Sequence, residues 1–375
     1  MEKQIEMENK NRIYFNLFAI LSTFARTLVE IFVSLYLFKN KFTINQIVLF
    51  YFIANSVAIL LTYIYTWIGN KYKYTTVMIM GLISFSVMQM LLKNIVLSNL
   101  YIIKIAIIYS LYRRGYWISR RFYITNVIPK KNSTEKFSFV IITGQIASIV
   151  AGYIGALVLD FYGVQVLNII SSIILFISII PLFFIKYDKI EGKINFRKSI
   201  KKYNKNNIIA FSLYEINNII TFLFPIFISI YVKNTYKMAG NINAISNLAI
   251  IILVFIYGKI IKKKDYFVLT TILLILIVFV KININIYLIT VVIFIESIIK
   301  NMQNQSLNKI YFESRDDMNV MEYNFMYQII ESVARTIAVI PLLFISNIKL
   351  MIIFINIVIF ILLGIYIISE IKENI

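Results

Sequence analysis

The sequence contains no cysteine and no histidine among its 375 residues. Without cysteine there are no disulfides, thiolate metal sites or cysteine nucleophiles. Without histidine the chain lacks the commonest general base, the usual zinc ligand and the side chain that most often changes charge near neutral pH. The phosphate-binding pattern G-x-x-x-x-G-K-[ST] is also absent, which excludes ATP hydrolysis by that route. We therefore expect a protein that is not an enzyme and that uses neither a cofactor nor a metal ion.

Acidic residues are scarce as well: 18 of them face 38 lysines and arginines, giving a formal net charge of +20. Such a balance occurs in nucleic-acid-binding proteins. Here, however, 60% of the residues are apolar and the mean hydropathy is +0.79, values typical of multi-pass membrane proteins. We interpret the positive charge as a record of membrane topology and predict no nucleic-acid partner.

Twelve apolar stretches separated by short loops dominate the chain. A helix needs about 20 apolar residues to cross the hydrocarbon core of a bilayer. The sequence therefore predicts an all-α protein with twelve transmembrane helices embedded in a lipid bilayer. The expected spans are 13–37, 44–68, 75–92, 100–119, 137–159, 164–185, 208–232, 240–261, 266–283, 286–306, 323–345 and 349–369.

The basic residues are distributed unequally between alternate loops. One set of loops, together with both termini, holds 25 lysines and arginines, whereas the intervening loops hold 7. Basic residues of membrane proteins remain on the cytoplasmic side. This asymmetry predicts that both termini are cytoplasmic and that the chain lies in the cell membrane. The first ten residues, Met1 to Lys10, are polar and give no sign of a signal peptide.

The longest polar stretch, 186–207, divides the sequence into two six-span halves, 1–185 and 208–375. It carries eight basic residues, which we interpret as an orientation signal that rests on anionic lipid. A specific binding site is the alternative. The halves share a weak likeness, because polar aromatic segments follow spans four and ten. Duplicated halves commonly enclose a central substrate site.

Twelve spans, cytoplasmic termini and a basic loop between two halves resemble the major facilitator superfamily over essentially the whole chain. The family's motif G-x-x-x-D-R-x-G-R follows its spans two and eight. Here residues 65–73 read Tyr-Thr-Trp-Ile-Gly-Asn-Lys-Tyr-Lys and keep only the last basic residue. The second copy keeps Gly258 but has Lys262 in place of the Asp. The resemblance implies a secondary transporter that alternates access by rocking one half against the other, although the Asp of the family's gating salt bridge is missing.

Small residues line span five at steps of four. Gly144, Ser148 and Gly152 form one row, and Ala151 and Gly155 form another. Small residues at i and i+4 let helix backbones approach closely in lipid. The pattern predicts a tightly packed helix face, whether it serves packing alone or also a sliding contact during gating.

Ten charged residues fall inside the expected spans, where charge is costly and is usually functional or paired. In the superfamily that the chain resembles, spans one, four, seven and ten line the central cavity, and most of the ten residues occupy those spans. The resemblance therefore implies a substrate and ion pathway. Its expected members are Arg26, Glu30, Arg113, Glu215, Asn218, Glu296 and Lys300.

Three of the charge pairs are spaced by four residues, so the members of each pair share a helix face. Such a pair can instead neutralise itself and lock helices together. Glu331 and Arg335, in span eleven, form the pair that we expect to be structural. Lys300 could also snorkel to the cytoplasmic surface. The i,i+4 pairs are Arg26/Glu30, Glu296/Lys300 and Glu331/Arg335.

Glu215 is the expected proton carrier. Coupling to protons needs a carboxylate that changes protonation during the cycle, and a neighbouring cation holds a carboxylate ionised. Glu30 and Glu296 have cations on their own helices, whereas Glu215 has none at i,i+4.

Aromatic and proline residues carry less information. Tyr112, Tyr116 and Trp117 could contact substrate, but an interfacial aromatic belt is our interpretation. Pro225 in span seven and Pro341 in span eleven predict kinks.

The sequence as a whole predicts a monomeric secondary transporter of a small molecule, coupled to protons, with export preferred over import. The near balance of in-span charges favours a polar or zwitterionic substrate. One alternative is a flippase of the lipid-linked oligosaccharide and multidrug type. Another is a membrane sensor or assembly factor without transport, which would tolerate neutralisation of these charges. The potassium-channel run Thr-Val-Gly-Tyr-Gly is absent.

Overall fold

The computed structural model describes residues 2–127, 133–185, 203–231, 235–257, 266–283, 286–313 and 320–374. All regular structure within these ranges is helical, which confirms the predicted all-α class. Backbone polar groups in lipid must be paired within their own segment, and long apolar helices meet that need. Residues 186–202 of the predicted basic linker lie outside the described ranges, as do Gly258 and Lys262 of the second loop motif.

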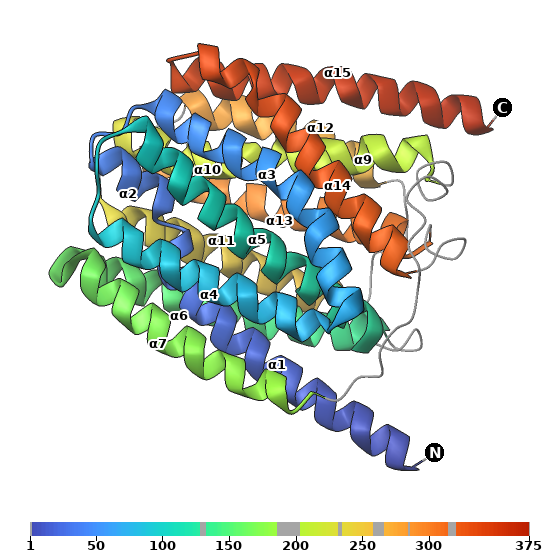
Figure 1. Ribbon diagram of the computed structural model, residues 1–375. Helices are drawn as coiled ribbons and strands as arrows, with labels where there is room; N and C mark the ends of the chain where they lie inside the picture. Colours follow the sequence, from blue (N-terminus) through green and yellow to red (C-terminus); the bar gives the residue numbers. More distant parts are fainter. Residues whose placement is uncertain are drawn as a thin grey trace. The chain divides into compact units, whose positions relative to one another are not determined.

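Figure 1 labels the helices in the order in which they follow one another along the chain. They are α1 (Glu2–Glu30), α2 (Val33–Lys39), α3 (Ile44–Lys71), α4 (Tyr74–Lys93), α5 (Asn99–Val127), α6 (Ser133–Phe161), α7 (Gly163–Phe183), α9 (Lys205–Asn217), α10 (Ile219–Tyr231), α11 (Tyr236–Tyr257), α12 (Tyr266–Asn283), α13 (Ile286–Glu313), α14 (Val320–Val339), the short 3-10 helix η1 (Pro341–Phe344) and α15 (Ile348–Asn374).

Ten stretches of the described chain are long and apolar enough to cross a bilayer, so this is a multi-pass membrane protein. Two further helices, α5 and α13, are 29 and 28 residues long but carry several of the in-span charges. The count of twelve spans therefore stays a prediction. The ten stretches are Lys10–Lys39, Ile44–Lys71, Tyr74–Lys93, Ile142–Phe161, Gly163–Phe183, Lys205–Tyr231, Tyr236–Val254, Tyr266–Asn283, Met321–Phe344 and Ile348–Lys372.

Helix interruptions occur inside three of these stretches. The first separates α1 from α2 directly after Glu30, and the second separates α9 from α10 at Asn218. Pro225 lies within α10, away from that second interruption. Pro341 does not kink a continuous helix as predicted: α14 ends at Val339 and η1 begins at Pro341, because proline lacks the N–H that would continue the helical ladder.

The chain forms two compact units. Unit 1 contains α1, α4 to α7, α11 and the later part of α3, whereas unit 2 contains α2, α9, α10, α12 to α15 and the earlier part of α3. The division within α3 falls between Ile59 and Leu60. Each unit thus combines segments from both predicted halves of the sequence. The predicted separation into 1–185 and 208–375 concerns the order of spans along the chain and stays a prediction.

In unit 1, α6 packs along both α1 and α11, and glycines make these contacts close. A Cβ atom on Gly155 would lie 2.8 Å from the backbone oxygen of Leu28 in α1, and one on Gly240 of α11 would lie 2.7 Å from that of Gly152. A Cβ on Gly144 would meet nothing within 4 Å. The tightly packed face predicted for span five is therefore confirmed at Gly152 and Gly155.

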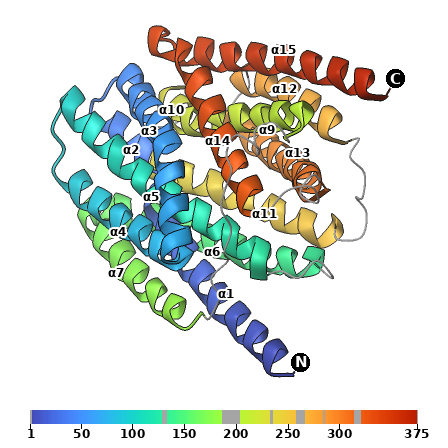
Figure 2. The same cartoon turned by 45° about the vertical axis from the view of Figure 1, so that its right-hand side comes forward.

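In unit 2, α9 is surrounded by α14, α15 and α13 (Figure 2). The ring of Tyr51 from α3 stacks on Phe222 of α10 with 3.8 Å between ring centroids. Asn45 donates a hydrogen bond to the backbone oxygen of Leu343 at 2.8 Å. These contacts tie the earlier part of α3 to the helices of unit 2.

Candidate functional site

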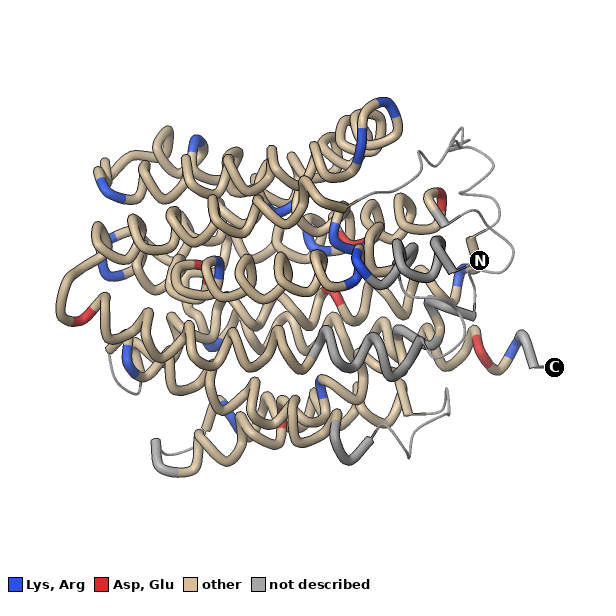
Figure 3. Tube along the Cα trace, turned by 90° about the horizontal axis from the view of Figure 1, so that it is seen from below, with Lys and Arg blue, Asp and Glu red and all other residues tan. Residues whose placement is uncertain are grey.

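Charged residues appear as isolated positions on otherwise uncharged helices (Figure 3). Because a lone charge is costly in lipid, the partners of each one indicate its role. The in-span charges with recorded partners gather in one cluster in unit 1 and in a group of contacts in unit 2.

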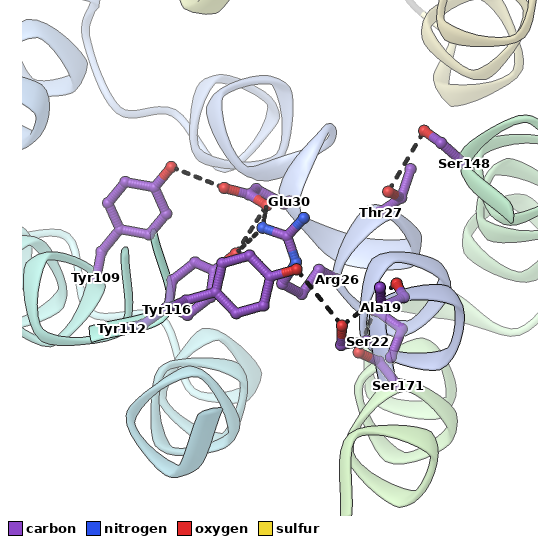
Figure 4. Close-up of polar contacts among 11 residues, drawn as sticks. Ala19, Ser22, Arg26, Thr27, Glu30, Tyr109, Tyr112, Tyr116, Ser148 and Ser171 are labelled. Carbon is purple, nitrogen blue, oxygen red and sulfur yellow. Dashed lines mark hydrogen bonds and ion pairs between the residues drawn. The ribbon is translucent and has the colours of Figure 1, made fainter. Parts of the chain in front are cut away.

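The unit 1 cluster centres on Arg26 and Glu30 at the end of α1 (Figure 4). Nη1 of Arg26 lies 3.3 Å from Oε2 of Glu30, so the predicted i,i+4 pair is confirmed. The same nitrogen donates to the Tyr112 hydroxyl at 2.9 Å. That hydroxyl in turn donates to Glu30 at 2.8 Å, and Tyr109 donates to the other carboxylate oxygen at 3.2 Å. Two tyrosine hydroxyls of α5 therefore hydrogen-bond to the charged groups of the ion pair.

Aromatic rings enclose the Arg26 guanidinium. Its central carbon lies 4.0 Å from the ring centroid of Tyr116 and 5.2 Å from that of Trp117, which are favourable cation–π distances. Tyr112 and Tyr116 are fully buried. The predicted interfacial belt is therefore wrong for these two tyrosines, because their polar ends pair with Arg26, Glu30 and Ser22 instead of water.

A second polar node in unit 1 lies on the close-packed face of α6. The Ser148 hydroxyl accepts hydrogen bonds from Thr27 of α1 at 3.4 Å and from Asn247 of α11 at 3.0 Å (Figure 4 shows the first). Asn243 of α11 donates to the Ser148 backbone oxygen at 3.0 Å. Three helices thus meet at one small polar residue of the predicted stripe.

In unit 2, Glu215 of α9 is fully engaged. Its carboxylate forms an ion pair with Arg335 of α14 and accepts a hydrogen bond from Tyr327 of the same helix at 2.9 Å. Asn218 donates a further hydrogen bond at 3.3 Å, so the two predicted pathway residues of span seven do lie together. Glu215 is 3% exposed, and its ionised form is stabilised by a cation that comes from another helix.

Arg335 is shared between two carboxylates. Besides Glu215 it pairs with Glu331, one turn earlier on α14, at 3.1 Å. The predicted i,i+4 pair exists, but it is not the separate structural pair that we expected. Glu215 has no cation at i,i+4 on its own helix, but α14 supplies one. Helix periodicity reveals only partners on the same helix and therefore did not predict this contact.

Glu296 and Lys300 of α13 do not pair as predicted within the described residues. Oε2 of Glu296 lies 2.5 Å from Nζ of Lys281, a buried residue in the last turn of α12. Lys281 also lies over the ring of Phe224, 3.3 Å from its centroid. The seven basic residues counted above in the intervening loops include Lys281, which the structure places, buried and paired, in the last turn of α12.

Lys300 turns toward another helix. Its Nζ donates to the Thr221 hydroxyl of α10 at 2.8 Å. Snorkelling to the cytoplasmic surface stays the alternative prediction for this residue. Thr221, Lys281 and Tyr327 are partners that the sequence did not single out. Of these three residues, only Lys281 could have been identified from the sequence, because it lies at the end of an apolar stretch long enough to span the membrane.

Arg113 is half-buried on α5 and its neighbour Arg114 is buried. The residues of α5 that meet Arg26 are instead Tyr112 and Tyr116, one position before Arg113 and three positions after it. A pathway role for Arg113 stays a prediction. Within the described ranges, no group of three acidic side chains is placed to hold a metal ion.

The family model of the Major Facilitator Superfamily matches residues 15–309. The chain belongs to this superfamily. The resemblance inferred from span count, loop charge and the two halves is thereby confirmed. A comparison with curated proteins gives no match.

Solved structures of transporters share the fold. A mutant of the nucleoside transporter NupG is 10% identical, with a TM-score of 0.69 over 95% of this chain and 99% of that one. A bacterial homologue of the human drug peptide transporters PepT1 and PepT2 is 8% identical, with a TM-score of 0.70 over 97% of both chains. A structure concerned with proton dependent oligopeptide transporters is 9% identical, with a TM-score of 0.69 over 97% of both. At these identities the likeness concerns the fold alone.

Proposed function

We propose that the protein is a secondary active transporter that moves a polar small molecule across the cell membrane by alternating access. In this proposal twelve spans form two six-helix halves, 1–185 and 208–375, which rock against one another, and both termini are cytoplasmic. Coupling is to protons, and export is preferred. Superfamily membership supports transport, and the folds shared with nucleoside and peptide transporters favour a polar substrate.

The observation that carries the proposal is the placement of paired charges on apolar helices of both units. Arg26 with Glu30, Glu215 with Arg335, and Glu296 with Lys281 all lie within helices of membrane-spanning length. A protein that only needed stable helices would do better with apolar contacts, because buried ion pairs contribute little net stability. Charges kept at this cost are typical of substrate and ion pathways.

Proton coupling is assigned to Glu215 and Glu331, which share the Arg335 guanidinium. One guanidinium neutralises one carboxylate, so this triad carries one surplus negative charge when both acids are ionised. Binding of a proton removes the surplus, and release restores it. Tyr327 and Asn218 donate to Glu215 in the structure, and these hydrogen bonds favour its ionised form.

The proposal is tested by transport. Cells with and without the protein are screened for export of metabolites and dyes at two external pH values, and the compound found is then followed in proteoliposomes. We expect Glu215→Gln and Glu331→Gln to abolish accumulation driven by a pH gradient while leaving exchange of substrate for substrate. Unchanged pH-driven flux in both variants would rule out this coupling site.

The alternatives make different predictions. A flippase of the lipid-linked oligosaccharide type would move lipid-linked probes and not soluble compounds. A sensor or assembly factor would keep its cellular effect after neutralisation of Arg26, Glu215 and Glu296. Superfamily membership favours the transporter over both.

A further inference from the structure

The ammonium group of Lys300 lacks a carboxylate partner in the described part of the chain. Its recorded contact is the neutral hydroxyl of Thr221, at 2.8 Å. Glu296 lies one turn earlier on the same helix, where a salt bridge would be expected. Its carboxylate is instead held by Lys281 at 2.5 Å. Lys281 is therefore the ion-pair partner of the carboxylate that the i,i+4 spacing would place beside Lys300.

The other carboxylate within electrostatic range of Lys300 is Glu215. That group is already bound by the Arg335 guanidinium, the Tyr327 hydroxyl and the Asn218 amide. The near neighbours thus leave Lys300 with a positive charge that no nearby anion contacts directly.

The position of Lys300 makes this charge accessible. Thr221 is exposed and Lys300 is half-buried, yet both lie in the interior of long helical stretches, Lys205–Tyr231 and Ile286–Glu313. An ammonium group facing hydrocarbon at that depth would be strongly unfavourable. The surface that carries Thr221 and Lys300 must therefore be reached by water, and by solutes that water carries.

We propose that Lys300 and Thr221 bind a carboxylate group of the transported molecule. The inference rests on the proposed transport function and deepens it by naming the substrate class. The ammonium group supplies unused N–H donors and the Thr221 hydroxyl supplies an O–H donor, so one carboxylate satisfies both residues. A single cation matches the single charge of a carboxylate, whereas a phosphate brings more charge and is better met by several donors. Glu215 and Glu296 remain with their own cations and do not compete.

The test measures thermal unfolding of the full chain in lipid nanodiscs, because a ligand that binds the folded state raises the unfolding temperature, and the rise increases with the ratio of ligand concentration to Kd. The probes are paired: lactate with lactamide, and the dipeptide Ala-Ala with its C-terminal amide. Uridine serves as an uncharged solute and inorganic phosphate as the alternative anion. We expect at least one carboxylate to stabilise the protein and its amide to have no effect.

Variants assign the effect to the residues. Lys300→Met should weaken carboxylate binding by about ten- to a hundredfold, since it removes a charge-assisted hydrogen bond, and Lys300→Arg should retain it. Thr221→Val should weaken binding less, and Thr221→Ser should preserve it. Lys104→Met is the matched control, because Lys104 is an exposed lysine of α5 in unit 1.

Three results would overturn the inference: no carboxylate stabilises the wild type, Lys300→Met and Thr221→Val both bind as tightly as the wild type, or phosphate is the preferred anion. Failure of the proposed function looks different. If carboxylates bind through Lys300 but proteoliposomes show no flux of any compound, the carboxylate site is supported and the proposed transport function is rejected. If uridine is transported and no carboxylate binds, the transport function is supported and the carboxylate site is rejected.

Discussion

In unit 1 the Arg26 guanidinium pairs with a carboxylate of its own helix, whereas in unit 2 the Arg335 guanidinium takes carboxylates from two helices. Tyrosine hydroxyls and aromatic rings complete the first arrangement. In the second, Glu215 is 3% exposed and depends on a cation that α14 supplies. Unit 1 thus holds a locally neutral pair inside an aromatic shell, and unit 2 holds charges whose balance depends on helix positions. We infer that proton and substrate exchange act on unit 2.

The largest expected effect comes from removing the shared guanidinium. Arg335→Met removes the guanidinium that two buried carboxylates share, and we expect it to lower the free energy of unfolding by about 3–5 kcal/mol. Arg26→Met is the matched variant. Glu30 then keeps the hydroxyls of Tyr109 and Tyr112, so the loss should be about 1–3 kcal/mol. Chemical unfolding in detergent measures both, and equal losses would remove the distinction between the units.

An intermediate effect is expected at the α6–α11 contact of unit 1. Gly240→Ala would place a methyl group 2.7 Å from the Gly152 backbone oxygen, and overpacking of this kind costs about 1–3 kcal/mol. Gly144→Ala is the control, because its new methyl group would meet nothing within 4 Å. Thermal unfolding of both variants checks the prediction, which fails if the two glycines tolerate alanine equally well.

The smallest effect is expected for Tyr112→Phe. The variant removes the hydroxyl that links Arg26 to Glu30 but keeps the ring and the direct 3.3 Å ion pair. We expect a loss of about 1 kcal/mol in the free energy of unfolding and little change in transport. A loss of pH-driven flux in this variant would show that unit 1 takes part in coupling as well.

The sequence predicted the membrane class, most helix positions and the presence of charged residues inside the helices, because apolar length and in-span charge are properties of single segments. It also predicted the Arg26/Glu30 pair, whose members are neighbours on one helix face. It did not reveal that Arg335 would reach Glu215, or that Lys281 would displace Lys300 from Glu296. Those contacts depend on which helices pack together, and the spacing of residues within one helix carries no information about that.

The exchange of segments between the units bears on how the protein is made. Gly240 of α11 packs closely against Gly152 of α6, yet α6 is synthesised and inserted well before α11. During that interval α1 can already pack against Gly155, but the surface around Gly152 lacks α11 and must be shielded by lipid or by the insertion machinery. A truncated chain that ends before residue 235 would lack α11. Unit 1 could then not complete its packing around Gly152.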